Sequence, residues 1–111
     1  MKEQKINRVM NMLSILREIN PDMNVNMMLT LFEVAKGQGV TGRKLEDALD
    51  MNHATAARML RYFDRLQSAG KPGLDLFRVE LDPLDYKAKL RFLNKNGVDL
   101  MARLEAALDG N

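Results

Sequence analysis

Apolar residues recur at helical spacing through the first two thirds of the chain, with interruptions at a few defined places. The spacing predicts helices over residues 3–19, 25–36, 42–49 and 53–66. Asn20-Pro21-Asp22 ends the first, because proline cannot continue a helix, and Gly37 and Gly39 end the second. Asn24, Thr41 and Asn52 are favoured N-cap residues that stand just before the later runs. The two runs between Val40 and Leu66, joined by a tight break at Asp50-Met51, are therefore predicted to form a helix-turn-helix.

The second helix of this unit has two faces of different character. Ala56, Leu60 and Phe63 recur at i, i+4 and i+7 and should face the core. The opposite face begins with short polar or small side chains and continues with arginines: Asn52, His53, Thr55, Ala57, Arg58, Arg61, Tyr62 and Arg65. A DNA-recognition helix needs close approach to base edges and neutralisation of phosphates, and this face offers both. The alternative is an ordinary helical hairpin with a solvated arginine face.

The period changes from 3.6 to 2 after a loop over residues 68–73 that contains two glycines and a proline. Phe77, Val79 and Leu81 alternate with charged residues, as do Ala88, Leu90 and Phe92. The pattern predicts a β-hairpin with one buried face on each strand and a turn at Asp82-Pro83-Leu84-Asp85. With Leu81 opposite Tyr86, Glu80 would face Lys87, which leaves Lys89 and Arg91 free to contact phosphate.

Asn94 is predicted to cap a last helix over residues 95–108. This helix and the one at residues 3–19 carry apolar residues on more than one face. We expect the two terminal helices to pack on each other and across a two-fold axis, which would make the protein a homodimer. The alternative is that both bury their apolar surface within the monomer. Residues 1–111 are expected to form a single domain.

Composition narrows the function classes. The absence of cysteine excludes disulfides, thiolate zinc sites and cysteine redox sensing. No apolar run approaches the roughly 20 residues needed to span a bilayer, so we expect a soluble, cytoplasmic protein with no membrane partner. The chain has a single histidine and no glycine-rich phosphate loop, so the sequence offers no set of residues suited to catalysis. We therefore expect neither an enzyme nor a protein with a metal or cofactor.

The charge of the chain is unevenly distributed. Residues 1–51 carry seven Lys/Arg and seven Asp/Glu, residues 52–91 carry eight against five, and residues 92–111 carry two against three. The whole excess of +2 thus lies on the predicted recognition helix and the segment after it. A local positive excess is expected where a protein binds a polyanion, although a solvated face could also produce it.

Two stretches, LTLFEVAKGQGVTGRKLEDALDMNHATAARMLRYFDRL and DPLDYKAKLRFLNKNG, resemble MarR-type transcriptional regulators over about residues 25–108. The family's Ser/Thr-x-x-Arg pattern is matched by Thr55-Ala56-Ala57-Arg58. Its Asp-x-Arg wing motif is matched by Asp85-Tyr86-Lys87, in which lysine replaces the arginine, and its Leu-Thr-x-x-Gly by Leu93-Asn94-Lys95-Asn96-Gly97. Lysine lacks the planar fork with which arginine pairs an aspartate and enters a narrow minor groove.

The resemblance implies a mainly α winged helix-turn-helix with a small β-hairpin, and a homodimer that binds double-stranded DNA at an inverted-repeat operator, as a repressor. Asn52, His53, Thr55 and Arg58 would contact base edges, and Arg61, Arg65, Lys87 and Lys89 would contact phosphates. For His53 the alternative is that it merely extends the helix cap. The chain is shorter than is usual in the family, so a compact regulator without a small-molecule effector, of phage or mobile-element type, is favoured. The rival hypothesis is a winged-helix module that binds polymerase or another regulator rather than DNA.

Overall fold

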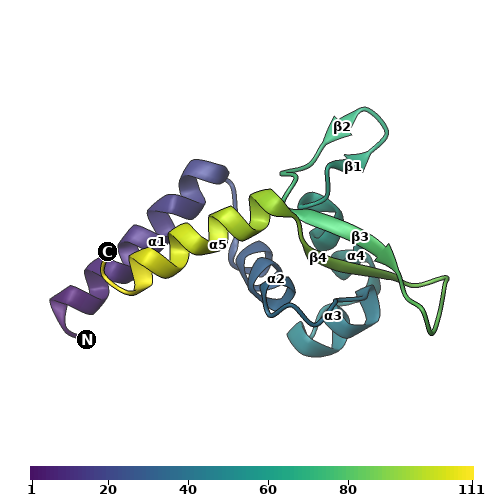
Figure 1. The fold of residues 1–111 in the computed structure, drawn as a ribbon, viewed down its shortest axis with the longest axis horizontal. Coiled ribbons are helices and arrows are strands. Elements are labelled where there is room, and N and C mark those ends of the chain that lie inside the picture. The colour runs from purple at the N-terminus through teal and green to yellow at the C-terminus, as the bar shows by residue number, and fades with distance from the viewer.

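The structure, a computed structural model, describes residues 1–111 and contains five helices and two small antiparallel sheets (Figure 1). The elements in order are α1 (Glu3–Ile19), α2 (Val25–Ala35), α3 (Gly42–Leu49), α4 (His53–Tyr62), β1 (Leu66–Ser68), β2 (Lys71–Pro72), β3 (Phe77–Leu81), β4 (Lys89–Leu93) and α5 (Lys95–Leu108). The mainly α winged helix-turn-helix architecture expected from the sequence is confirmed. None of the helices combines the length and the apolar character required to cross a membrane.

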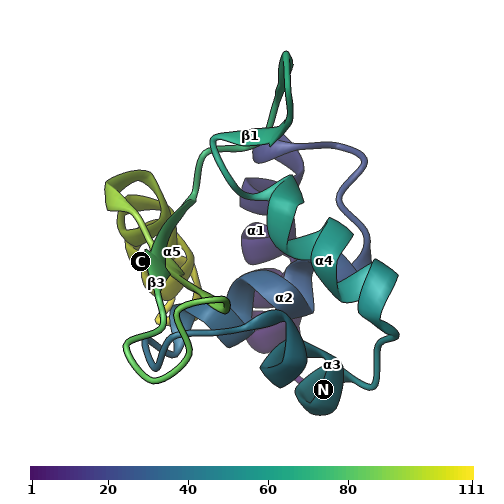
Figure 2. The same cartoon turned by 90° about the vertical axis from the view of Figure 1, so that its right-hand side faces the viewer.

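The molecule is elongated, with extents of 47 × 29 × 24 Å. Helices α1 and α5 lie side by side at one end, where both termini also lie, and we call this pair the stalk (Figure 1). Leu16, Leu100 and Leu104 are buried in the stalk, and Arg103 pairs with Glu18 at 2.7 Å across its surface. The remaining elements, α2 to β4, form the other end, which we call the reading head; Figure 2 looks onto it.

Side-chain caps begin four of the five helices. The side-chain oxygens of Asn24, Thr41, Asn52 and Asn94 accept hydrogen bonds from backbone N–H groups three residues later, at 2.9, 3.1, 2.8 and 2.9 Å. Each bond satisfies a helix-terminal donor that would otherwise have no partner. The turn of the helix-turn-helix is made by Asp50, which adopts the left-handed conformation (φ 52°, ψ 50°). All four predicted caps and the predicted break are confirmed.

The core of the reading head lies between α2, α3 and α4. Leu31, Leu45, Leu60 and Phe63 are almost completely inaccessible to solvent. Phe63 also stacks on Phe77, the first residue of β3, with ring centroids 4.9 Å apart. The start of the wing is thus fixed against the end of α4.

The wing, formed by β3 and β4, differs from the sequence prediction in its register. Leu81 lies opposite Lys89, not Tyr86, and Glu80 lies opposite Leu90, not Lys87. The loop between the strands therefore spans residues 82–88 and is longer than the predicted four-residue turn. Asp82 and Asp85 each stabilise a turn within it. The expectation of one buried face per strand is also wrong. Val79 and Leu81 remain 44% and 65% exposed, whereas Leu90 and Phe92 are partly buried beside Gly39.

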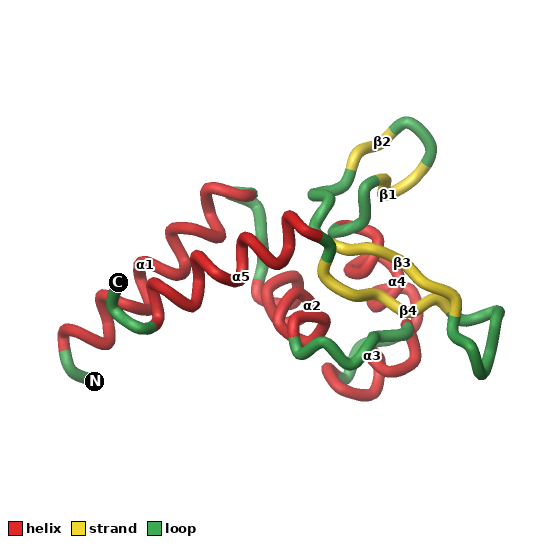
Figure 3. Tube along the Cα trace, viewed as in Figure 1, coloured by secondary structure: helices red, strands yellow, loops and turns green.

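The segment after α4 also differs from the sequence prediction. Residues 68–73, predicted to be a loop, belong to a short hairpin in which Leu66 pairs with Pro72 and Ser68 with Lys71 (Figure 3). This β1–β2 hairpin stands out from the reading head at the end of α4 (Figures 1 and 2). Pro72 was not predicted to lie in a strand, because proline is compatible only with an edge strand. In this two-stranded sheet both strands are edge strands.

Candidate nucleic-acid interface

Helix α4 is held by one apolar face and presents the other to solvent. Ala56, Met59 and Leu60 are buried against the core, while Arg58 and Arg61 are exposed. This division follows the helical spacing of the sequence, because residues three and four apart lie on one face. An exposed helix of this kind has the diameter to enter the major groove of DNA.

Three of the four residues predicted to contact bases lie at the start of α4 or on its N-cap. The Asn52 side-chain oxygen is committed to the helix cap, so only its NH₂ group remains to donate to a base. The His53 side chain is 87% exposed, with Nδ1 at 3.3 Å from Glu46 Oε2 of α3. Thr55, one turn before Arg58, is partly exposed.

Two residues assigned to the outer face of α4 lie elsewhere. The helix ends at Tyr62, so Arg65 follows it and lies at the foot of the β1–β2 hairpin. Tyr62 turns inward, where its hydroxyl oxygen accepts a hydrogen bond from the Asn20 side chain at the end of α1. Burial raises the pKa of Tyr62 and nearby Asp22 adds to the increase, while the Asn20 hydrogen bond opposes it. Long-range packing with α1, which helical periodicity does not register, explains this difference.

The loop of the wing is shaped by its two aspartates. Asp82 accepts a hydrogen bond from the Leu84 N–H at 2.9 Å, and Asp85 accepts one from the Lys87 N–H at 3.2 Å. Asp85 therefore organises the backbone and forms no ion pair with the Lys87 side chain. Lys87 and Lys89 are exposed and unpaired.

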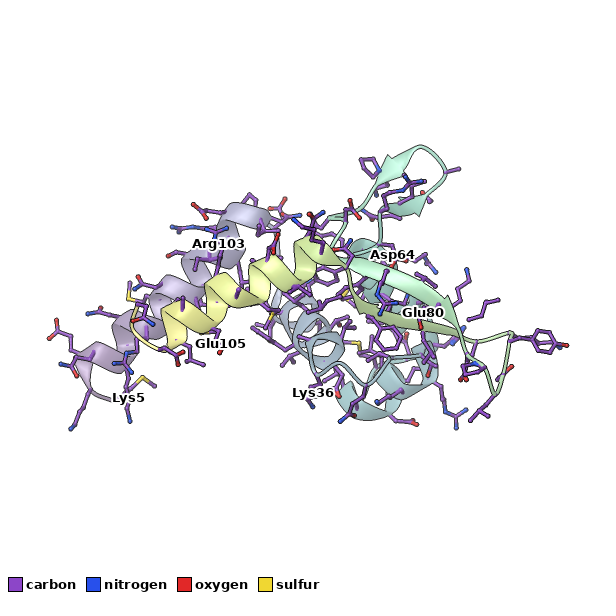
Figure 4. The ribbon with its side chains drawn as sticks, viewed as in Figure 1. Lys5, Lys36, Asp64, Glu80, Arg103 and Glu105 are labelled. Carbon is purple, nitrogen blue, oxygen red and sulfur yellow. The ribbon has the colours of Figure 1, made fainter.

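Arg91 is not free to contact phosphate, contrary to the sequence expectation. Its guanidinium lies 2.9 Å from the Asp64 carboxylate, and the two side chains are only 11% and 13% exposed (Asp64 is labelled in Figure 4). The Arg91 backbone also exchanges two hydrogen bonds with Val40, at 3.1 and 2.9 Å. Arg91 thus joins the wing both to the end of α4 and to the residue before the Thr41 cap.

A hollow of about 440 Å³ separates the wing loop from the start of α3. It brings together three of the predicted contact residues, His53, Lys87 and Lys89, and adds Arg43, which the sequence analysis did not single out. Asp82 and Asp85 also line it, so its charge is mixed. The hollow thus places His53, at the start of α4, near the two predicted lysines of the wing.

Six exposed cations on the reading head have no acidic partner. Of the eight lysines and arginines between residues 52 and 91, only Arg78 and Arg91 lie within 4.0 Å of a carboxylate. The other six have no carboxylate within that distance and are exposed: Arg58, Arg61, Arg65, Lys71, Lys87 and Lys89. Five of these were predicted. Lys71 was missed because it lies between Gly70 and Pro72, where neither helical nor strand periodicity assigns it to a face.

The chain resembles known proteins in its three-dimensional structure. No protein-family model and no curated protein sequence matches the chain. Among solved structures, MepR of Staphylococcus aureus in complex with DNA has a TM-score of 0.69 at 20% identity, over 87% of this chain and 72% of that one. The transcriptional regulator Tm0710 of Thermotoga maritima has a TM-score of 0.71 at 12% identity, over 96% and 66%.

A mutant of MarR from E. coli matches with a TM-score of 0.62 at 22% identity, over 96% of this chain and 69% of that one. These matches run from the stalk through the reading head, because they cover almost the whole chain. At such identities the likeness is one of fold. The chain has the winged helix-turn-helix fold of the MarR-type regulators.

Proposed function

We propose that the protein is a sequence-specific double-stranded DNA-binding transcriptional regulator, a repressor that acts as a homodimer on an inverted-repeat operator. In this proposal α4 enters the major groove and the wing reaches the adjacent minor groove. Asn52, His53, Thr55 and Arg58 read base edges. Arg61, Arg65, Lys87 and Lys89 contact phosphates.

The observation that carries the proposal is the set of six unpaired, exposed cations on the reading head. An arginine or lysine that lacks an internal carboxylate can neutralise a phosphate without first breaking an ion pair. Each such contact releases counterions from DNA, which supplies most of the sequence-independent affinity. The fold adds support, since the similar MepR structure contains DNA.

The proposed dimer is supported by apolar surface left open on the stalk. On α1, Ile6, Val9, Met10 and Leu13 are 41%, 42%, 58% and 46% exposed. Val98 and Leu108 of α5 are 56% and 53% exposed. A second copy of the stalk would bury this surface, and a two-fold axis would present two recognition helices to the two halves of a palindromic site.

The rival hypothesis, a winged-helix module that binds protein, rested on the acidic residues of the wing. These residues have local partners: Glu80 pairs with Arg78, and Asp82 and Asp85 accept backbone hydrogen bonds within the loop. They are therefore accounted for by the conformation of the wing. The six exposed cations between residues 52 and 91 that have no carboxylate within 4.0 Å favour a polyanion as the partner.

The test is a fluorescence-anisotropy titration with DNA from upstream of the protein's own gene, at two salt concentrations. We expect tight binding that weakens steeply with salt. Arg58→Ala should weaken binding by about 1–3 kcal/mol, because Arg58 lies one turn after Thr55 on the exposed side of α4.

Arg17→Ala provides the matched control, since Arg17 is an exposed arginine on the stalk with no ion pair. It should leave the affinity unchanged. Binding equal to that of random DNA, or an Arg58→Ala variant equal to wild type, would contradict the proposal and direct the search to protein partners.

A further inference from the structure

The β1–β2 hairpin is an addition to the reading head that the proposed function has not used. It extends the chain beyond the end of α4 and returns to it before β3 begins. Figure 2, which looks onto the end of the molecule that carries α3 and α4, shows the hairpin standing clear of the other elements, with no neighbour at its tip.

The foot of the hairpin is tightly fixed to the end of α4. The N–H groups of Gly73 and Leu74 donate to the carbonyls of Arg65 and Tyr62, each at 3.0 Å. Gly73 approaches the Asp64 carbonyl so closely that a Cβ atom would lie 2.0 Å from that oxygen. Since the foot cannot move without breaking these contacts, the direction of the hairpin is set by α4.

The arms of the hairpin are closed by further contacts. The Gln67 side-chain NH₂ donates to the Pro72 carbonyl at 3.0 Å, and Gly70 makes the turn with φ of 75°. Glycine adopts this left-handed conformation without a steric cost. The hairpin is therefore an ordered projection with a defined tip.

The charge of the hairpin is entirely positive. Residues 65–74 contain Arg65 and Lys71 and no acidic residue. The carboxylates that flank the segment are engaged elsewhere, Asp64 with Arg91 and Asp75 with the Asn94 side chain. Arg65 and Lys71 thus add two exposed cations, beyond the end of α4, to Arg58 and Arg61 on the helix.

We propose that the β1–β2 hairpin is a second phosphate-binding projection, which contacts the DNA backbone beyond the end of the recognition helix through Arg65 and Lys71. This inference rests on the proposed function, and it adds a contact that does not depend on the wing. A helix lying in the major groove is bordered by phosphates, and a projection that continues from its end meets the backbone there. The contact is with phosphate and is independent of base sequence.

The experiment measures affinity for a mixed-sequence 30-base-pair duplex over a range of salt concentrations, with the full chain. Each phosphate neutralised contributes about 0.9 to the slope of log affinity against log salt. Lys71→Gln should reduce the magnitude of the slope by about 1, whereas Lys71→Arg should preserve it. Lys5→Gln is the matched control, because Lys5 lies near the far end of the stalk (Figure 4) and should leave the slope unchanged.

A second measurement locates the hairpin directly. The chain has no cysteine, so Ala69→Cys creates a single attachment site at the tip for an iron chelate that cleaves nearby DNA. We expect cleavage of the duplex by the Ala69→Cys conjugate and none by a Gln4→Cys conjugate on the stalk. Wild-type binding that weakens with Arg58→Ala, together with a Lys71→Gln slope equal to that of Lys5→Gln, would overturn the hairpin contact alone. Failure of the wild type to bind DNA would overturn both proposals.

Discussion

At the scale of single residues, the pair formed by Arg91 and Asp64 joins the wing to the recognition helix. A charged pair removed from water is stabilising only while both partners are present, because either one alone would be a buried charge without compensation. Their side chains, 11% and 13% exposed, approach that condition. The orientation of the wing relative to α4 thus depends on one ion pair and one backbone bridge.

Asp64→Asn should lower the free energy of unfolding by about 2 kcal/mol, since the Arg91 guanidinium would lose its charged partner. Asp99→Asn is the control. Asp99 pairs with Lys95 at 3.5 Å on the surface, with side chains 65% and 90% exposed, and its loss should cost less than about 0.5 kcal/mol. Urea denaturation measures both variants, and equal losses would show that the Arg91 pair contributes no more than a surface pair.

The ionisation of Tyr62 should make the stability of the fold depend on pH in the alkaline range. Burial raises its pKa above the ordinary value of 10.0, so the folded state holds the phenol proton more tightly than the unfolded state does. The stability that results is fully present below pH 10 and is lost as the pH rises through the folded-state pKa.

We therefore expect the wild type to lose stability above about pH 10 more steeply than Tyr62→Phe, which has no phenol to ionise. At neutral pH the variant should be less stable by about 1 kcal/mol, because the Asn20 hydrogen bond is lost. Thermal unfolding followed across this pH range provides the measurement. Parallel pH profiles for the two proteins would refute the assignment.

At the scale of elements, the helices could be predicted from the sequence and the two hairpins could not be predicted in full. A helix begins where a side chain such as Asn52 or Asn94 can accept from an N–H three residues later, and both groups lie within one short stretch of chain. The exposed face of α4 could also be predicted, because residues three and four apart share a face, except at the end of the helix. Tyr62 and Arg65 do not lie on the predicted outer face, because the helix ends at Tyr62 and the end of α1 packs against it there.

The alternation of apolar and charged residues predicts a strand, but it does not determine which residues of two strands lie opposite each other. A shift of one residue exchanges the two faces of a strand, and here the seven-residue loop with its two aspartate turns sets the register. Arg91 consequently faces Asp64, which is 27 residues away in the sequence. The β1–β2 hairpin shows no alternation at all, so its existence depends on the contacts at its foot.

The foot of that hairpin can be tested at Gly73. An added Cβ would meet the Asp64 carbonyl oxygen at 2.0 Å, so Gly73→Ala should destabilise the protein by about 2 kcal/mol or more. Gly42→Ala is the matched control, because a Cβ there meets nothing within 4 Å at the first residue of α3. It should be neutral or stabilising by up to about 1 kcal/mol. Denaturant titration of both variants decides, and similar midpoints would contradict the close approach.

At the scale of the whole molecule, the stalk and the reading head divide two tasks. The reading head carries the proposed DNA contacts and the stalk carries the apolar surface proposed for the dimer, and the two ends lie apart along the 47 Å length. Burial of the stalk surface by a second copy would leave both reading heads exposed. The proposed dimer and the proposed DNA contacts therefore use different surfaces and can be tested separately.

Leu13→Glu should prevent formation of the proposed dimer, because a carboxylate placed in an apolar interface loses its hydration without gaining a partner. Sedimentation equilibrium gives the mass. Leu84→Glu makes the same chemical change on the wing loop, where Leu84 is 97% exposed, and should leave the mass unaltered. A wild type that sediments as a monomer at micromolar concentration would refute the stalk interface.

The two-stranded wing also has a consequence for handling the protein at high concentration. The outer edge of β4 is occupied at Arg91 by its bridge to Val40, but β3 has a strand partner on one side only. A free strand edge with exposed apolar residues, here Val79 and Leu81, is a template for aggregation. Arg78 and Glu80 interrupt that edge with charge, as gatekeeper residues do. Replacing both with uncharged residues would therefore be expected to turn the wing from a solvated projection into a site of fibril-like self-assembly.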